Sequence, residues 1–152
     1  MKPYNELNLI EQLEYDEGCM LTRYKCPSGF NTIGIGHNCD ANPYSPDGYR
    51  IKNEITKEQA HGLLSHDIQV VVDGLSRKCP QFRKVQDSNH ENRRRALINM
   101  GFQLGVNGLL KFKNMLKAID DDDWELARAH ALDSDWAKQT PQRADRVTRL
   151  FL

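Results

Sequence analysis

The sequence lacks any long apolar run: no stretch approaches the roughly 18 consecutive apolar residues that a membrane-spanning helix needs. Its first eight residues, MKPYNELN, also lack the apolar core of a secretory signal peptide. From these two absences we expect a protein that is made in the cytosol and does not insert into a membrane.

The chain also lacks an excess of either charge, because its 21 basic and 21 acidic side chains cancel. A neutral chain is not typical of proteins that bind nucleic acids by general electrostatic attraction, so no nucleic-acid partner is expected. The charges are spread unevenly, since the first fifty residues carry four basic and seven acidic side chains. The rest of the chain therefore carries a small positive excess.

Cysteine is scarce, and the four residues of this type contain no Cys-x-x-Cys pair: Cys19, Cys26, Cys39 and Cys79. A structural zinc site is therefore not expected, although His37 lies two positions before Cys39. The Asp120 to Asp123 run lacks the spacing and distal glutamate of a calcium loop. We expect no metal and no other cofactor. Free thiols are the expected state in the cytosol, and a disulfide is the alternative outside it.

What is present fits a single domain over residues 1–152, large enough for two lobes around a cleft. Apolar residues at helical spacing predict an N-terminal helix over about 5–15, stopped by Gly18. Over about 16–55, glycine and proline interrupt short β-branched and aromatic runs. This pattern is typical of a small antiparallel sheet, with turns at 27–29 and 46–48.

The pattern changes to helix at Thr56, which forms a capping box with Gln59. Apolar spacing then predicts one long connecting helix over about 57–78, roughly 30 Å long and ended by Cys79-Pro80. Short helices are predicted over about 80–152, with start signals at Ser88 to Glu91, at Asp120 to Asp123 and at Thr140-Pro141. The expected fold is α+β, with a sheet lobe and a helical lobe that includes the N-terminal helix.

Residues suited to hydrolytic chemistry gather in one short window. Glu17 lies just past the first predicted helix, Cys26 follows, and Thr32 opens the segment TIGIGH that ends at His37. Cleavage of a glycoside needs a proton donor and a group that handles water or positive charge. Glu17 is the natural acid; the alternative is a solvated carboxylate among its acidic neighbours.

Three segments resemble the phage-type lysozymes of glycoside hydrolase family 24, a group that includes the lysozyme of the T-even bacteriophages. They are Tyr15 to His37, Ala96 to Gly105 (ALINMGFQLG) and Trp136 to Ala144 (WAKQTPQRA). The matches follow the family order and span nearly the whole chain. The resemblance implies a lysozyme-like fold and hydrolysis of the β-1,4 bond between N-acetylmuramic acid and N-acetylglucosamine in peptidoglycan.

The resemblance also implies catalytic roles. Glu17 becomes the general acid, and Thr32 holds the attacking water in an inverting reaction. Cys26 stands where the commonest family pattern has aspartate, although the family also admits cysteine. We hypothesise that Cys26 orients water or stabilises developing positive charge, without being an obligatory base. Lys25 and Arg23 could help to form its thiolate if their side chains point toward it. The alternative is a structural or disulfide-bonded cysteine.

Two further pairs of residues follow from the resemblance. His37 and Asp67 are expected to form a structural salt bridge between the sheet and the long helix. Gln103 and Arg143 are candidates for substrate binding, and Arg143 could instead pair with Glu17. The alternative for both is an exposed helical residue.

The predicted role is that of an endolysin, a monomeric muramidase that causes lysis of the host cell. It would accumulate in the host cytoplasm and reach the periplasm and cell wall through a separate holin. Two alternatives stay open. One is a lytic transglycosylase, which cyclises the muramic sugar, and the other is a catalytically silent peptidoglycan-binding or virion module.

Overall fold

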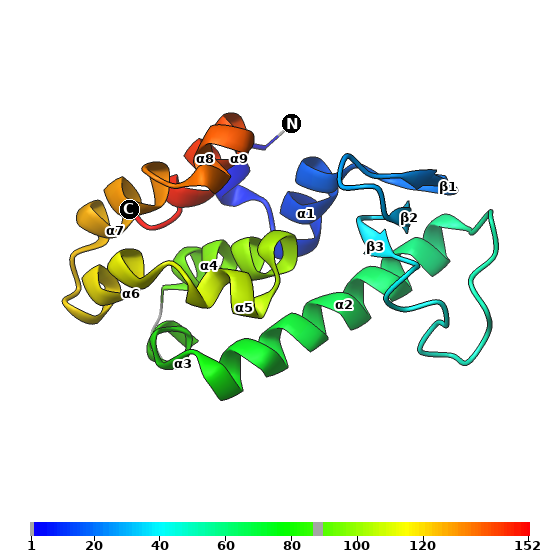
Figure 1. Ribbon diagram of the computed structural model, residues 1–152, viewed down its shortest axis with the longest axis horizontal. Coiled ribbons are helices and arrows are strands. Elements are labelled where there is room, and N and C mark those ends of the chain that lie inside the picture. Colours follow the sequence, from blue (N-terminus) through cyan, green and yellow to red (C-terminus); the bar gives the residue numbers. More distant parts are fainter. Residues whose placement is uncertain (1, 87–89) are drawn as a thin grey trace. The chain divides into compact units, whose positions relative to one another are not determined.

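The computed structural model describes residues 2–86 and 90–152, which form two compact units (Figure 1). The first comprises Leu7–Gln69 and is called the sheet unit. The second comprises Val70–Leu152 with the described residues before Leu7, and is called the helical unit. The elements combine many helices with one small sheet, which confirms the predicted α+β class.

The sheet unit begins with helix α1, Leu9–Glu17, preceded by a 3-10 turn at Tyr4–Glu6 that belongs to the helical unit. Asn8 caps α1: its side chain accepts from the Glu11 backbone, and the Glu11 side chain accepts from the Asn8 backbone. The helix therefore starts and ends later than the predicted range of about 5–15. Apolar spacing identifies its buried face, whereas the polar cap at Asn8 fixes its first turn.

Three short strands follow and form one antiparallel sheet in the order β1-β2-β3. They are β1 (Met20–Lys25), β2 (Asn31–Gly34) and β3 (His37–Asn38). Tyr24 pairs with Thr32, and Ile33 pairs with His37. The expected turn after Cys26 joins β1 to β2. The sheet therefore brings Cys26, Thr32 and His37 into one small hairpin system.

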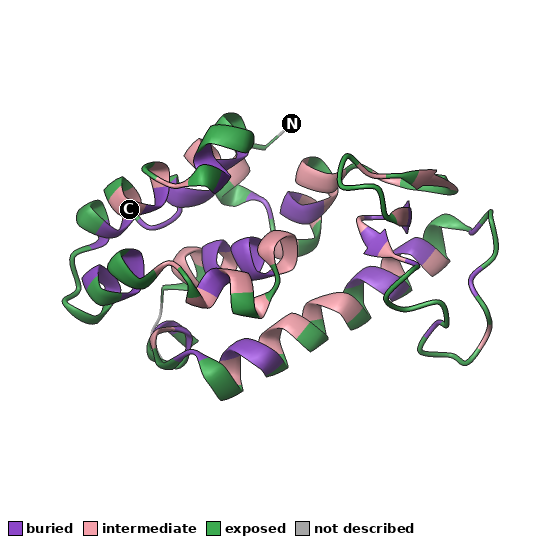
Figure 2. Ribbon diagram, in the orientation of Figure 1, coloured by how far each residue is buried: buried purple, intermediate pink, exposed green. Residues whose placement is uncertain are grey.

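The core of the sheet unit is apolar and includes residues from β2, from the loop before the long helix and from that helix. One cluster of its buried residues (purple in Figure 2) comprises Ile33, Cys39, Ile51, Ile55, Ala60 and Leu63, with Cys19 and Tyr49 packed against them. This core fixes the strands to the first turns of α2. The hairpin loops at the edge of the sheet are left to carry polar side chains.

Helix α2 spans Lys57–Lys78, the range that the sequence predicts, and it runs from the sheet unit into the helical unit. The Thr56 and Gln59 side chains accept from each other's backbone amides at 3.1 and 2.9 Å, which is the predicted capping box. Its other end falls at Cys79-Pro80. Both ends were readable because they depend on local capping chemistry and on proline.

The helical unit continues with seven shorter helices in the described part of the chain. They are α3 (Pro80–Gln86), α4 (Glu91–Leu104), α5 (Val106–Leu110), α6 (Lys113–Asp120), α7 (Trp124–Leu132), α8 (Asp135–Gln139) and α9 (Pro141–Arg149). Their inward faces are apolar, and Phe82, Leu97, Ile98, Met100, Leu109 and Phe151 are among the fully buried side chains.

The predicted helix starts in this unit have different outcomes. Asp123 caps α7, since its side chain accepts from the Leu126 amide at 3.0 Å. Thr140 makes no side-chain cap on α9: its hydroxyl donates to the Trp136 carbonyl at 3.1 Å and accepts from the Gln103 amide at 3.4 Å. The predicted box at Ser88 to Glu91 lies partly outside the described residues, and His90 makes no side-chain cap on α4.

The division into units differs from the predicted lobes in the place of α1. The sequence interpretation put the N-terminal helix with the helical lobe, whereas α1 groups with the sheet. The physical reason is direct contact: the Glu14 carboxylate lies 4.0 Å from the Lys57 ammonium and 3.6 Å from the His61 ring. At the end of the same helix, the Glu17 carboxyl packs against the backbone of Gly36.

Candidate active site

Glu17 is the last residue of α1, and not a loop residue just past the helix as the sequence indicated. Gly18 follows with φ at +73°, and its amide donates to the Glu14 carbonyl at 2.8 Å. This cap ends the helix and turns the chain toward β1. The backbone of Glu17 is thereby held by a closed helical turn, while its side chain is partly exposed.

Cys26 occupies the turn between β1 and β2. Its amide donates to the Phe30 carbonyl at 3.0 Å, and its carbonyl accepts from the Gly29 amide at 2.8 Å. The backbone amide of Phe30, helped by the Thr32 hydroxyl and the amides of Ser28 and Gly29, lowers the pKa of the Cys26 thiol against an opposing effect of burial. Hydrogen bonds to the sulfur favour the thiolate because they stabilise its charge.

The source of this stabilisation differs from the one that the sequence suggested. Lys25 and Arg23 were the expected helpers of a Cys26 thiolate. The Arg23 guanidinium instead donates to the Ile51 carbonyl at 2.8 Å and to the Lys52 carbonyl at 3.4 Å. The turn itself provides the stabilising donors, and a turn's amide directions are not visible in a list of side chains.

Thr32 is buried in β2, with 4% of its surface exposed. Its hydroxyl can donate its proton either to the Phe30 carbonyl, at 3.0 Å, or to the Cys26 sulfur. Because a hydroxyl has a single proton, this proton is used within the hairpin. The Thr32 oxygen can therefore accept a hydrogen bond from a water molecule.

Tyr24 is a neighbour of the site that the sequence reading missed. It pairs with Thr32 across the sheet. Burial raises the pKa of the Tyr24 phenol, and the negative charges of Glu17 and Cys26 raise it further. The phenol therefore keeps its proton at neutral pH and stays a hydrogen-bond donor. A tyrosine at the end of the predicted first strand, two residues before Cys26, was the available signal.

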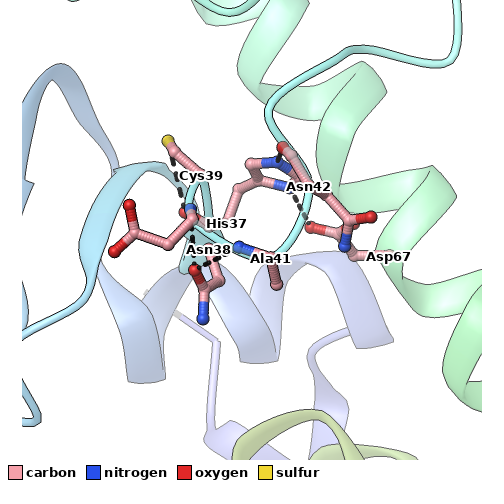
Figure 3. A network of polar contacts seen from close by, with 7 residues as sticks. His37, Asn38, Cys39, Ala41, Asn42 and Asp67 are labelled. Carbon is pink, nitrogen blue, oxygen red and sulfur yellow. Dashed lines mark hydrogen bonds and ion pairs between the residues drawn. The ribbon is translucent and has the colours of Figure 1, made fainter.

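His37 and Asp67 are in contact, as the resemblance implied (Figure 3). The His37 Nδ1 atom lies 2.7 Å from the Asp67 carboxylate, and its Nε2 atom lies 2.9 Å from the Asn42 carbonyl. Burial alone would lower the pKa of His37, but the hydrogen bond and charge of Asp67 and the Asn42 carbonyl together raise it. Both ring nitrogens face acceptors, an arrangement that suits the doubly protonated imidazolium.

Gln103 and Arg143 lie in the helical unit, and both have protein partners. Gln103 accepts from the Trp136 indole at 2.7 Å and donates to the Thr140 hydroxyl at 3.4 Å. Trp136 is also one wall of a pocket of about 360 Å³ that Phe112 and Lys111 help to line. Gln103 is therefore oriented beside an aromatic pocket, and its substrate role stays a prediction.

Arg143 is buried and not an exposed helical residue, with 7% of its surface exposed. Its Nε and Nη2 atoms donate to the Asn99 side-chain oxygen at 3.2 and 2.9 Å. Asn99 in turn donates to the Tyr4 hydroxyl at 3.1 Å. The network ties the N-terminal segment to α4 and α9, and contact of Arg143 with substrate stays a prediction.

Within residues 2–86 and 90–152, no group of three or more His, Cys, Asp or Glu side chains is arranged to hold a metal ion. In the same residues no helix combines the length and apolar character needed to cross a membrane. All four cysteines are free thiols. Burial raises the pKa of Cys19, Cys39 and Cys79, whereas the pKa of Cys26 is lowered.

A helical protein with a small sheet, a glutamate at a helix end and a cysteine–threonine pair in a hairpin has the parts of a lysozyme-type glycoside hydrolase. The model of the phage lysozyme family matches residues 14–149 of the chain. The chain belongs to the phage lysozyme family, which confirms the predicted resemblance and makes it a peptidoglycan hydrolase.

Similar proteins come from Dictyostelium discoideum and from a phage. Probable T4-type lysozyme 2 of Dictyostelium discoideum is 31% identical over 159 residues, which cover 95% of this chain and 93% of the relative. Probable T4-type lysozyme 1 of the same organism is 35% identical over 155 residues, covering 92% and 91%. The pre-baseplate central spike protein Gp5 of Enterobacteria phage T4 is 35% identical over 163 residues, covering 96% of this chain but 28% of the spike protein.

Proposed function

We propose that this enzyme hydrolyses the β-1,4 bond between N-acetylmuramic acid and N-acetylglucosamine, with Glu17 as the general acid. The observation that carries the proposal is the set of Glu17, Cys26 and Thr32 within one compact unit. Glu17 has its backbone fixed by the end of α1, and the Cys26–Thr32 pair is fixed by the Phe30 carbonyl and amide. Rigid support of this kind keeps reacting groups in position.

The chemistry balances with these three groups. The Glu17 carboxyl donates its proton to the glycosidic oxygen as the bond to the muramic C1 breaks. A water molecule that donates a hydrogen to Thr32 directs a lone pair at C1 and forms the new bond. The thiolate of Cys26 stabilises the positive charge that develops on the sugar and can accept the proton that the water loses. The anomeric configuration is inverted, since water attacks from the face opposite the leaving group.

We further propose that the biological role is that of an endolysin that lyses its host cell. The enzyme would accumulate in the host cytoplasm as a monomer and meet the periplasmic wall after a separate holin opens the membrane. Support for the monomer is the presence of all three proposed catalytic residues in one chain. Western blotting of fractionated host cells before and after expression of a holin would test this location.

The similarity to the spike protein favours one alternative role. That protein is named as a pre-baseplate central spike, and this chain matches about a quarter of its length. A chain that served in a virion would co-purify with particles, whereas an endolysin would stay in the lysate. Sedimentation of particles followed by immunodetection separates the two roles, and neither outcome affects the proposed bond cleavage.

The bond itself is tested by mass spectrometry of fragments released from purified peptidoglycan, after borohydride reduction. We expect reduced N-acetylmuramic acid at the new ends with the wild-type enzyme and no release with Glu17→Gln. Anhydro-muramic ends would instead establish a lytic transglycosylase. A folded wild-type protein that releases nothing would establish a binding module.

A further inference from the structure

The backbone of Gly36 lies directly against the Glu17 carboxyl group. Gly36 is in the loop between β2 and β3 and has φ at +69°. A Cβ atom added there would lie 3.1 Å from both Cδ and Oε2 of Glu17 and 3.2 Å from its Cγ. These separations are shorter than ordinary contacts between carbon atoms, so any side chain at position 36 must displace something.

The loop itself cannot easily move away, because both neighbours of Gly36 are anchored. Ile35 is buried, and His37 is buried and bonded to Asp67 and to the Asn42 carbonyl. Figure 3 shows His37 held between these two partners, with the Asn38 side chain accepting from the Ala41 backbone beside it. Anchors on both sides make the Gly36 backbone a fixed surface.

The backbone of Glu17 is fixed as well. It closes the last turn of α1, and the Gly18 cap follows immediately. With both backbones held, the remaining freedom lies in the side-chain torsions of Glu17. A Cβ atom at position 36 would therefore be accommodated by rotation of the Glu17 carboxyl away from its present place.

We propose that Gly36 is a positioning residue, whose missing side chain lets the Glu17 carboxyl lie against the loop in its reactive orientation. The inference rests on the proposed function, in which Glu17 is the acid. The contacts at 3.1–3.2 Å require the Glu17 carboxyl to give way by at least a few tenths of an ångström, and a misplacement of about 1 Å can lower a rate by roughly a hundredfold. Gly36 thus affects the reaction through Glu17. The His37–Asp67 pair contributes indirectly, because it anchors the loop that contains Gly36.

The test compares Gly36→Ala with two other glycine variants that have positive φ. Gly48 has φ at +89° and no atom within 4 Å of an added Cβ, so Gly48→Ala reports backbone strain alone. Gly34 has φ at +65°, and an added Cβ meets Ala60 at 3.3 Å and Ile55 at 3.4 Å, so Gly34→Ala adds core crowding. Melting temperatures of all three show how much folded protein each assay contains.

The readout is the separation of kcat from KM on soluble peptidoglycan fragments. We expect Gly36→Ala to lower kcat by about 10- to 100-fold with KM within twofold of wild type. Gly48→Ala should keep both constants, and Gly34→Ala should lose melting temperature without a comparable loss of kcat per folded molecule. A structural role for Gly36 would produce the Gly34 pattern.

A double-mutant cycle with Glu17→Asp shows whether the effect of Gly36→Ala on kcat depends on the Glu17 side chain. Glu17→Asp draws the carboxyl group back by one methylene, which takes Cδ and Oε2 away from the new Cβ and leaves a Cγ atom as the remaining neighbour. We therefore expect Gly36→Ala to cause little further loss of kcat in the Glu17→Asp background. Equal losses in both backgrounds, or a kcat of Gly36→Ala that matches Gly48→Ala, would overturn the proposal.

Failure of the inference and failure of the proposed function look different. If Glu17→Gln keeps wild-type activity, the proposed acid is wrong, and the role of Gly36 falls with it. If Glu17→Gln is inactive while Gly36→Ala behaves like Gly48→Ala, the acid stands and only the positioning role is wrong.

Discussion

The two units of the molecule hold their polar side chains in different ways. In the sheet unit, Cys26 and Thr32 are held by backbone groups of one hairpin, and Glu17 lies at a helix end. In the helical unit, Gln103 and Arg143 are held by other side chains, in the Gln103–Trp136 and Arg143–Asn99 contacts. Backbone support leaves functional atoms available for substrate, whereas paired side chains mainly satisfy each other.

The two units also differ in the sign of their net charge. Residues 7–69 carry five basic and nine acidic side chains, and the rest of the chain carries sixteen basic and twelve acidic ones. The overall neutrality therefore hides an acidic unit with the proposed catalytic groups and a basic unit with structural networks. We therefore expect substitutions at the proposed catalytic residues of the sheet unit to reduce activity more than stability. Substitutions at His37, Asp67 and Arg143 should instead reduce stability more than activity.

The largest effect is expected at Glu17. Glu17→Gln should lower kcat on peptidoglycan by about 10²–10⁴-fold with a nearly unchanged melting temperature, because it removes the acidic proton but keeps the shape. Glu14→Gln, one turn earlier on the same helix, is the matched control and should stay within twofold of wild type. Turbidity loss of purified walls gives both rates. A Glu17→Gln enzyme with more than a tenth of wild-type activity would sink the assignment.

Cys26 should give the next largest loss. Cys26→Ala should lower kcat by about 10²-fold, and Cys26→Asp should recover most of it, since a carboxylate can replace the thiolate. Because the thiolate is the required form, activity should fall as pH drops through the Cys26 pKa. That fall should move to lower pH in Cys26→Asp, since an aspartate ionises at about pH 3.9.

The control for Cys26 is Cys19→Ser, which alters another partly exposed thiol of the same unit. Its pH–rate profile should match that of the wild type. Full activity of Cys26→Ala at all pH values would show that the sulfur has no part in the reaction.

The His37–Asp67 pair should affect stability in a pH-dependent way. The folded-state pKa of His37 is raised, so its contribution is fully present below the unfolded value of about 6.5 and is lost as pH rises through the folded value. Asp67→Asn should therefore reduce the free energy of unfolding by about 1.5–3 kcal/mol near pH 5.5 and by less near pH 8. Urea denaturation of the wild type and of Asp67→Asn at both pH values measures this loss of unfolding free energy.

His66→Gln is the comparison variant, because His66 lies beside Asp67 on α2 but is exposed. It should show no such pH dependence. A cost for Asp67→Asn that is equal at pH 5.5 and pH 8 would mean that the pair is not stabilised by a charged His37.

Arg143 should give the smallest of these effects. Arg143→Met leaves the buried Asn99 oxygen without its two guanidinium bonds and should cost about 1–3 kcal/mol of unfolding free energy. Arg149→Met is the control, because the Arg149 side chain is 67% exposed and its pairing with Asp145 contributes less than about 0.5 kcal/mol. Thermal denaturation compares the stabilities of the two variants with that of the wild type. A rise in KM for Arg143→Met without a loss of stability would instead favour substrate contact.

The sequence predicted best those features that depend on neighbouring residues. Both ends of α2 follow from the Thr56–Gln59 box and from Pro80, and the hairpin turn after Cys26 follows from Pro27 and Gly29. Apolar spacing was a weaker guide to α1, because the cap at Asn8 determines where the helix starts. Glu17 was consequently assigned to a loop.

Features that depend on distant residues could not be predicted from local pattern. Thr140 has the sequence of a helix cap, but its hydroxyl is bound to Trp136 one turn earlier. Gly36 reads as one of several turn glycines until α1 brings Glu17 against it. The ionisation of Cys26 depends on the directions of the amides within its turn. The sequence shows only the nearby cations Arg23 and Lys25, and these do not account for the lowered pKa of Cys26.

The central claim is that Thr32 and Cys26 handle a water molecule while Glu17 protonates the leaving oxygen. It is tested most directly by proton NMR of the sugar anomer first formed from soluble glycan strands. Inversion requires the first product to be the α-anomer, followed by slow mutarotation. A β-anomer as the first product would contradict this claim, because retention requires two displacements at C1, the first by a nucleophile such as Cys26 or the acetamido group of the substrate.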